Sequence, residues 1–80
     1  MPEIFRYLGY SFFFYSREHE PIHIHIEGKD GYAIYDLVES CFVMRELHGI
    51  KANDQKKIEK FIAENKDIVI KRWKEHFDRE

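Results

Sequence analysis

Apolar and polar residues alternate over short stretches in the first half of the chain, and this period of two predicts β-strands. Gly9 separates two aromatic-rich stretches and predicts the tight turn of a hairpin. Gly28 to Gly31 predicts a second turn, and polar Glu39 and Ser40 predict a third break. The strands that we expect cover residues 3–8, 10–16, 22–27, 32–37 and 40–47.

After Gly49 the apolar residues recur every three or four positions, which predicts helices. Asn53 or Asp54 is the expected N-cap of the first helix. A single helix over 54–77 would be ~36 Å long at 1.5 Å per residue, too long for so small a domain. We therefore expect a break around residues 65–67. The two apolar stripes contain Ile58, Phe61 and Ile62, and then Val69, Ile70, Trp73, His76 and Phe77.

These elements predict an α+β fold, with a mainly antiparallel sheet of about five strands followed by two C-terminal helices packed on one face. The 80 residues form a single domain, 1–80, because half of so short a chain could not bury enough apolar surface to fold alone. The strands are expected within 3–47 and the helices within 53–78.

Composition adds limits on location and on partners. The formal net charge of −2 provides no overall attraction to nucleic acid or to an anionic membrane, so a polyanion would need a local basic patch. Cys41 is the sole cysteine, and we expect its side chain to be buried. Because a single cysteine cannot form an intramolecular disulfide, the sequence favours a reducing, cytoplasmic location. No stretch approaches the ~20 apolar residues of a membrane helix, so we expect no membrane partner.

The segment from Glu18 to His25 carries most of the candidate chemistry. It reads Glu-His-Glu-Pro-Ile-His-Ile-His and holds three of the five histidines, His19, His23 and His25. Alternation in the strand after Pro21 directs the isoleucines to one face of the sheet and His23 and His25 to the other.

The chain resembles a small bacterial and archaeal family catalogued as domain of unknown function 4160. The resemblance rests on the opening Met-Pro-x-Ile-x-Arg, on the histidine run of residues 18–25 and on the closing helix with Trp73, and it extends over nearly the full length. The family has no settled activity. Its members often lie beside a second small gene in pairs that look like toxin–antitoxin modules, so the resemblance implies a cognate small antitoxin-like protein as partner.

Acid–base catalysis on RNA is one interpretation of the histidines, and it suits a small toxin. Cleavage through the 2′-hydroxyl needs a base, an acid and a cation near the phosphate, and it needs no metal or other cofactor. The Cα atoms of His23 and His25, two apart on a strand, are ~6.6 Å apart, a separation across which a phosphate fits between two imidazoles. With His19 they are the candidate catalytic histidines of an endoribonuclease.

The catalytic interpretation also needs a cation and an orienting carboxylate. Arg17 is the candidate cation, with Arg6 of the first strand as the alternative. Glu20 or Glu18 is placed to orient an imidazole.

Two other interpretations stay open for the same segment. His23 and His25 form a His-x-His pair that could bind zinc or another divalent transition metal if a third ligand were present. The histidines could equally be polar residues on a solvent-facing strand, without a chemical role.

Aromatic residues provide a second candidate surface. Phe13 and Tyr15, together with Tyr7, are expected on the sheet face that the helices leave uncovered. A cognate protein or a second copy of the chain would supply the cover that such a face needs. The histidines, taken together with the toxin–antitoxin context that the resemblance implies, predict a toxin-like ribonuclease, with a noncatalytic protein-binding module or a small metal-binding protein as alternatives.

Overall fold

The computed structural model describes residues 3–14 and 22–77, and among these the side chains through Glu75. Its sheet contains β1 (Glu3–Tyr7), β2 (Tyr10–Phe13), β3 (His23–Glu27), β4 (Tyr32–Val38) and β5 (Cys41–His48). The strands lie in the order β1-β2-β3-β4-β5 and all neighbours are antiparallel. The helices α1 (Ala52–Glu64) and α2 (Lys66–Phe77) follow. The predicted α+β fold is therefore confirmed.

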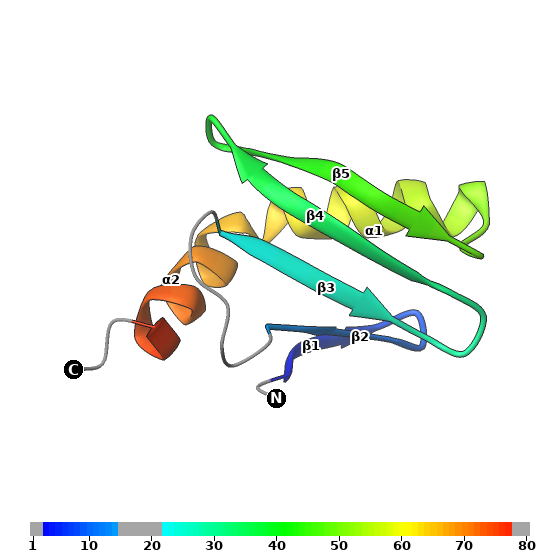
Figure 1. The fold of residues 1–80 in the computed structure, drawn as a ribbon, viewed down its shortest axis with the longest axis horizontal. Helices are drawn as coiled ribbons and strands as arrows, with labels where there is room; N and C mark the ends of the chain where they lie inside the picture. Colours follow the sequence, from blue (N-terminus) through cyan, green and yellow to red (C-terminus); the bar gives the residue numbers. More distant parts are fainter. Residues whose placement is uncertain (1–2, 15–21, 78–80) are drawn as a thin grey trace.

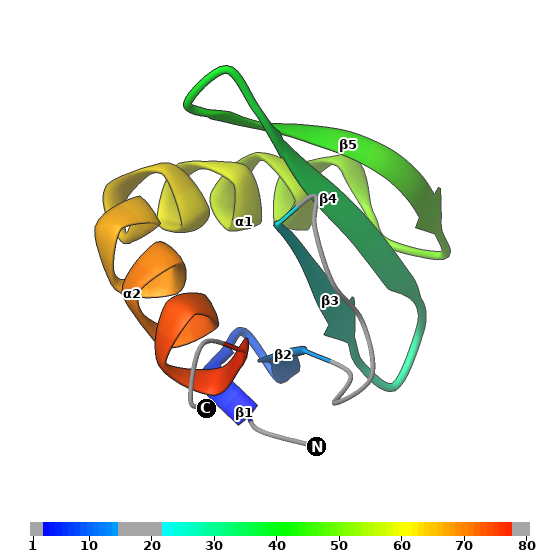
Figure 2. The same cartoon turned by 60° about the vertical axis from the view of Figure 1, so that its left-hand side comes forward.

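Both helices lie on one side of a strongly curved sheet, and α2 turns away from α1 toward β1 and β2 (Figures 1 and 2). The core between the two layers is largely aromatic and β-branched. Its most deeply buried side chains are Trp73, Tyr35, Phe12, Phe14, Ile24, Ile26, Ile58, Ile62 and Val69. Two isoleucines of β3, on the face that the alternation predicted, and members of both predicted helical stripes are among these buried residues.

Two of the hairpin turns have two residues in the left-handed region of backbone conformation. Leu8 and Gly9 have φ of 54° and 80° and join β1 to β2. Glu39 and Ser40 have φ of 49° and 73° and join β4 to β5. Positive φ at both central residues matches the right-handed twist of the strands, and this is why the predicted breaks make tight turns.

Asn65 ends α1 and begins α2, as the length argument predicted. Its backbone N–H donates to the carbonyls of Phe61 and Ile62, and its side-chain amide also donates to the Phe61 carbonyl at 2.9 Å. Its own carbonyl accepts from Ile68 and Val69, at the start of α2. One residue thus provides partners at the end of one helix and at the start of the next.

Several local predictions need correction. The helix starts at Ala52 after Lys51, one residue before the predicted region, so Asn53 and Asp54 lie in the first turn and neither is the N-cap. β5 reaches His48, one residue past its predicted end. Cys41 is exposed, not buried, because it pairs with Val38 beside the turn, at the tip of the β4–β5 hairpin.

Neither helix in the described part of the chain is long and apolar enough to cross a membrane.

Candidate functional site

The second half of the histidine run forms β3, in the centre of the sheet. Ile24 and Ile26 are buried in the core beneath the helices. His25 is directly opposite Phe13 of β2 and Ile34 of β4, and directly opposite residues share a face of the sheet. His25 therefore lies on the face that the helices leave uncovered, as the alternation predicted.

Four aromatic rings are in contact along one end of the sheet. The His25 ring stacks on Phe13 with the ring centroids 5.6 Å apart, and it meets His23 edge-to-face at 5.2 Å. The His23 ring lies 5.3 Å from Trp73 of α2. His23 is only 5% exposed, whereas His25 is half-buried. Of these two imidazoles, His25 is the one that a ligand can reach.

A shallow cavity of about 280 Å³ lies beside His25 on the uncovered face. Phe13 and His25 line it together with Tyr32 and Ile34 of β4. Tyr32 is among the exposed large side chains of the structure, and its ring also stacks on His48 with centroids 4.8 Å apart. An exposed aromatic ring next to an imidazole is a surface on which a planar base could stack.

A carboxylate and a guanidinium lie next to the histidines. Asp36 of β4 is directly opposite His23. Arg45 of β5 donates to both carboxylate oxygens of Asp36, from Nε at 3.0 Å and from Nη2 at 2.7 Å. Such a bidentate ion pair fixes the orientation of the guanidinium relative to the carboxylate.

The ion pair depends on an irregularity between β4 and β5. Ile34 pairs with Glu46 and Tyr35 pairs with Met44, so Arg45 is an extra residue on β5. A bulge of this kind redirects a side chain, and here Arg45 reaches Asp36.

The charges around Asp36 keep it ionised. The hydrogen bonds from Arg45 are the main cause that lowers the pKa of Asp36 below its ordinary value, while partial burial opposes them by raising it. The coulombic interactions of the carboxyl group with Arg45, His23 and His25 lower its pKa further. A lowered carboxyl pKa means a carboxylate at neutral pH.

The structure brings together only part of the predicted catalytic set. His23 and His25 are in contact. His19, Arg17 and Glu20, as well as Glu18, lie outside the described residues. Arg6, the alternative cation, forms an ion pair at 3.0 Å with Glu3 of its own strand.

The predicted aromatic face has a different composition in the structure. Tyr7 lies on the helix-covered side, where its ring stacks on Phe61 of α1 with centroids 4.1 Å apart, so its expected placement was wrong. The reason is the turn at Leu8 and Gly9, which pairs Tyr7 with the buried Tyr10. Phe13 is on the predicted face but is only 4% exposed, and Tyr15 lies outside the described residues. Partner binding through Phe13 and Tyr15 stays a prediction.

For a metal ion, the described side chains include no group of three or more histidine, cysteine, aspartate or glutamate residues that could hold one. His23 and His25 supply two ligands at most, and a zinc site needs three or four.

Sequence reasoning missed Asp36 and Arg45. The turn at residues 28–31 pairs Glu27 with Tyr32, and counting back along both strands from this pair reaches His23 opposite Asp36. That signal was present in the sequence. The bulge that directs Arg45 to Asp36 has no marker in the sequence, because its extra residue is neither glycine nor asparagine.

Comparison with known proteins finds one family that matches most of this chain. The model of the family described as domain of unknown function (DUF4160) matches residues 9–74. No curated protein and no solved structure matches the chain. Because the match includes the strands β2 to β5, the helix α1 and most of α2, the chain belongs to the family of domains of unknown function DUF4160.

Proposed function

We propose that this protein is the toxin-like component of a toxin–antitoxin type module, and that it acts in the cytoplasm as a metal-independent ribonuclease. The observation that carries the proposal is the position of His25. Its imidazole lines the cavity with Tyr32 and contacts His23, and the ion pair of Asp36 and Arg45 lies on the neighbouring strands. Cleavage of RNA without metal needs a base, an acid and a cation. His25 is a candidate for one of the two proton transfers, Arg45 is a candidate for the cation, and the Tyr32 ring is a surface on which a base could stack.

The proposed reaction transfers the phosphoryl group from one oxygen of the RNA to another. A base removes the proton of the 2′-hydroxyl, the 2′ oxygen forms a bond to phosphorus, and the bond from phosphorus to the 5′ oxygen breaks. An acid gives a proton to that leaving oxygen. The products are a 2′,3′-cyclic phosphate and a 5′-hydroxyl, and no redox step or metal is involved.

Exposure assigns different roles to the histidines in this proposal. His25 is the reachable imidazole and transfers a proton to or from the RNA. His23 is enclosed between His25 and Trp73, so it acts as a positioning residue that holds the His25 ring. His19, predicted from the same run, is the candidate for the second proton transfer.

Arg45 is a further candidate for the cation of the proposed site, beside the predicted Arg17, which lies outside the described residues. Arg45 belongs to β5, and its ion pair holds the guanidinium at Asp36 of β4, the strand next to β3. A fixed guanidinium stabilises the negative charge that develops on the phosphate in the transition state.

A second candidate function, a noncatalytic binding module for a cognate antitoxin-like protein, is favoured by the outer hairpin. β5 is an edge strand of the sheet, and it exposes Val43 by 48% and Met44 nearly as much. Val38 of β4 is exposed to the same extent as Val43. An edge strand with exposed apolar residues favours pairing with a strand of another chain. Under this alternative, Val43→Lys abolishes complex formation and His25→Gln leaves it intact.

Induced expression in bacteria tests the proposed ribonuclease. The wild type, a His25→Gln variant and a His48→Gln variant are compared for growth, for total RNA and for soluble yield. His48 is the matched control because it also stacks on Tyr32 but lies on β5, away from the ring contacts of His23. Growth arrest with RNA cleavage is expected in the wild type and in the control, and not in His25→Gln. Equal growth with intact RNA in all three, at equal soluble yield, would contradict the proposal.

A further inference from the structure

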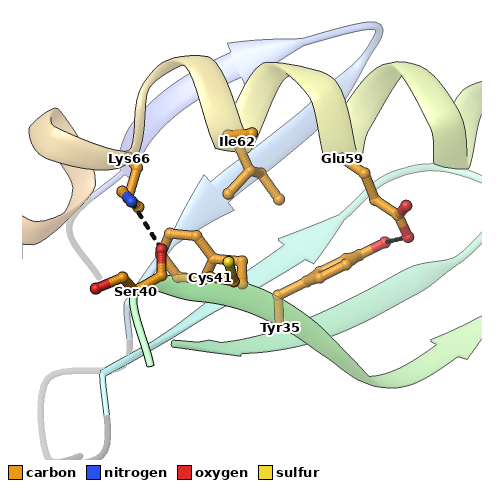
Figure 3. A pocket seen from close by; sticks show the side chains of 8 residues that line it. Tyr35, Ser40, Cys41, Glu59, Ile62 and Lys66 are labelled. Atoms are coloured by element: carbon orange, nitrogen blue, oxygen red, sulfur yellow. Dashed lines mark hydrogen bonds between the residues drawn. The ribbon is translucent and has the colours of Figure 1, made fainter. Parts of the chain in front are cut away.

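A second cavity lies on the opposite side of the sheet from His25, between the tip of the β4–β5 hairpin and the helix layer. It has a volume of about 290 Å³ (Figure 3). Its apolar wall includes Phe42 of β5 together with Ile62 and Ala63 of α1. This volume is at the lower end of the range for small-molecule sites. It suits a ligand whose apolar part is a single ring or a short branched chain.

Lys66 forms one end of this cavity. Its Nζ donates to the carbonyl oxygen of Ser40 at 2.7 Å, across from the hairpin turn (Figure 3). An ammonium group has three N–H donors, and the Ser40 carbonyl takes one of them. The positive charge is thereby held at the rim of the cavity.

The turn that Lys66 contacts is strained. Glu39 and Ser40 both have positive φ, a conformation that residues with a side chain rarely adopt. Ser40 of this turn and Lys66, which donates a hydrogen bond to it, together form the rim at this end of the cavity.

Glu59 forms the opposite end (Figure 3). Its Oε2 accepts a hydrogen bond from the Tyr35 hydroxyl at 2.8 Å and another from the Gln55 amide at 3.0 Å. Burial is the main cause that raises the pKa of Tyr35, and the hydrogen bond to Glu59 and the charge of Glu59 raise it further, so the hydroxyl stays a donor. Both donors are neutral, so neither hydrogen bond offsets the charge of the Glu59 carboxylate.

We propose that this cavity binds a small organic monocarboxylate with an apolar body. The carboxylate pairs with Lys66, and the body lies against Phe42, Ile62 and Ala63. Because Glu59 would repel a second negative charge, the far end of the ligand is neutral or positive, which excludes dicarboxylates. The inference is independent of the proposed ribonuclease site, which lies on the other face of the sheet.

Titration of the labelled full chain, followed by NMR, tests the inference. The probes are three carboxylates: phenylacetate, 3-methylbutanoate and hexanoate. Phenylacetamide, which has the same shape as phenylacetate but no charge, is the control ligand. The wild type is compared with Lys66→Gln and with a matched control, Lys60→Gln, which removes an exposed lysine of α1 from outside the cavity. The Ala63 methyl and the Cys41 amide report on the cavity.

At least one carboxylate is expected to shift the Ala63 and Cys41 signals and to saturate, with at least tenfold weaker binding in Lys66→Gln and unchanged binding in Lys60→Gln. If phenylacetate is that ligand, phenylacetamide binds at least tenfold more weakly. An Ala63→Leu variant, which places a larger side chain in the wall of the cavity, should abolish the saturable shift of the Cys41 amide. Absence of saturable shifts with all three carboxylates would overturn the inference, and so would equal binding in the wild type and Lys66→Gln.

Discussion

Replacing Trp73 by alanine tests how α2 is attached to the sheet and how His23 is enclosed. Trp73 is 2% exposed and contacts two side chains of the sheet region, Phe14 at 5.1 Å and His23 at 5.3 Å between ring centroids. Among the described side chains of α2, only Val69 is buried as deeply. Trp73 therefore supplies a large part of the apolar contact that holds this helix.

The magnitude follows from the burial. Truncation of a buried tryptophan to alanine destabilises a protein by about 3–5 kcal/mol. Stabilities of roughly 0.05–0.15 kcal/mol per residue give this 80-residue chain about 4–12 kcal/mol in total. Trp73→Ala should thus remove about a quarter or more of the free energy of unfolding, and Trp73→Phe should remove only about 1–2 kcal/mol.

Urea denaturation followed by circular dichroism measures the effect. With a slope of about 2 kcal/mol per molar urea, a loss of 4 kcal/mol lowers the midpoint by roughly 2 M. Arg72→Ala, an exposed neighbour on the same helix, is the control and should change the stability by less than about 0.5 kcal/mol. A loss below about 1 kcal/mol in Trp73→Ala would refute the inference that this side chain anchors α2.

Three further predictions concern the turns and the ion pair. Replacing Glu39 by Asn and Ser40 by Gly should raise the free energy of unfolding by about 1–2 kcal/mol in urea denaturation, because Asn-Gly suits a turn with two positive φ angles; an unchanged or lower midpoint would contradict this. Gly28→Ala should destabilise the protein, since its Cβ would lie 2.3 Å from the ring of buried Tyr10; an unchanged melting temperature would contradict the close packing. Asp36→Asn should cost about 1 kcal/mol at pH 7. Because the folded pKa of Asp36 is lowered, this difference should hold above about pH 5 and disappear as the pH falls through the folded pKa; a difference that grows toward low pH would contradict the ion pair.

Local signals explain why much of the fold was predictable. Gly9 marks the first hairpin, Gly28 and Gly31 bracket the second turn, and the Gly28 N–H donates to the Gly31 carbonyl at 2.9 Å. Asn65 joins the two helices where the length argument required a break. Each of these features depends on residues close together in the sequence, so composition and spacing reveal it.

The candidate site was predictable only in part because its geometry is long-range. The face of His25 follows from alternation alone. The burial of His23 depends on Trp73, fifty positions away in the chain, and on the direction in which α2 leaves α1. The placement of Arg45 depends on a bulge, and that of Tyr7 on the pairing across a two-residue turn. These features follow from the assembled sheet and helices, and local sequence signals do not specify them.

Cleavage of RNA by the purified protein in the presence of EDTA tests the central claim most directly. The wild type and His48→Gln are expected to produce fragments with 2′,3′-cyclic phosphate and 5′-hydroxyl ends. His25→Gln is expected to cleave at least a hundredfold more slowly, with an unchanged circular dichroism spectrum. Intact RNA with the folded wild type, or equal rates for the two variants, would contradict it.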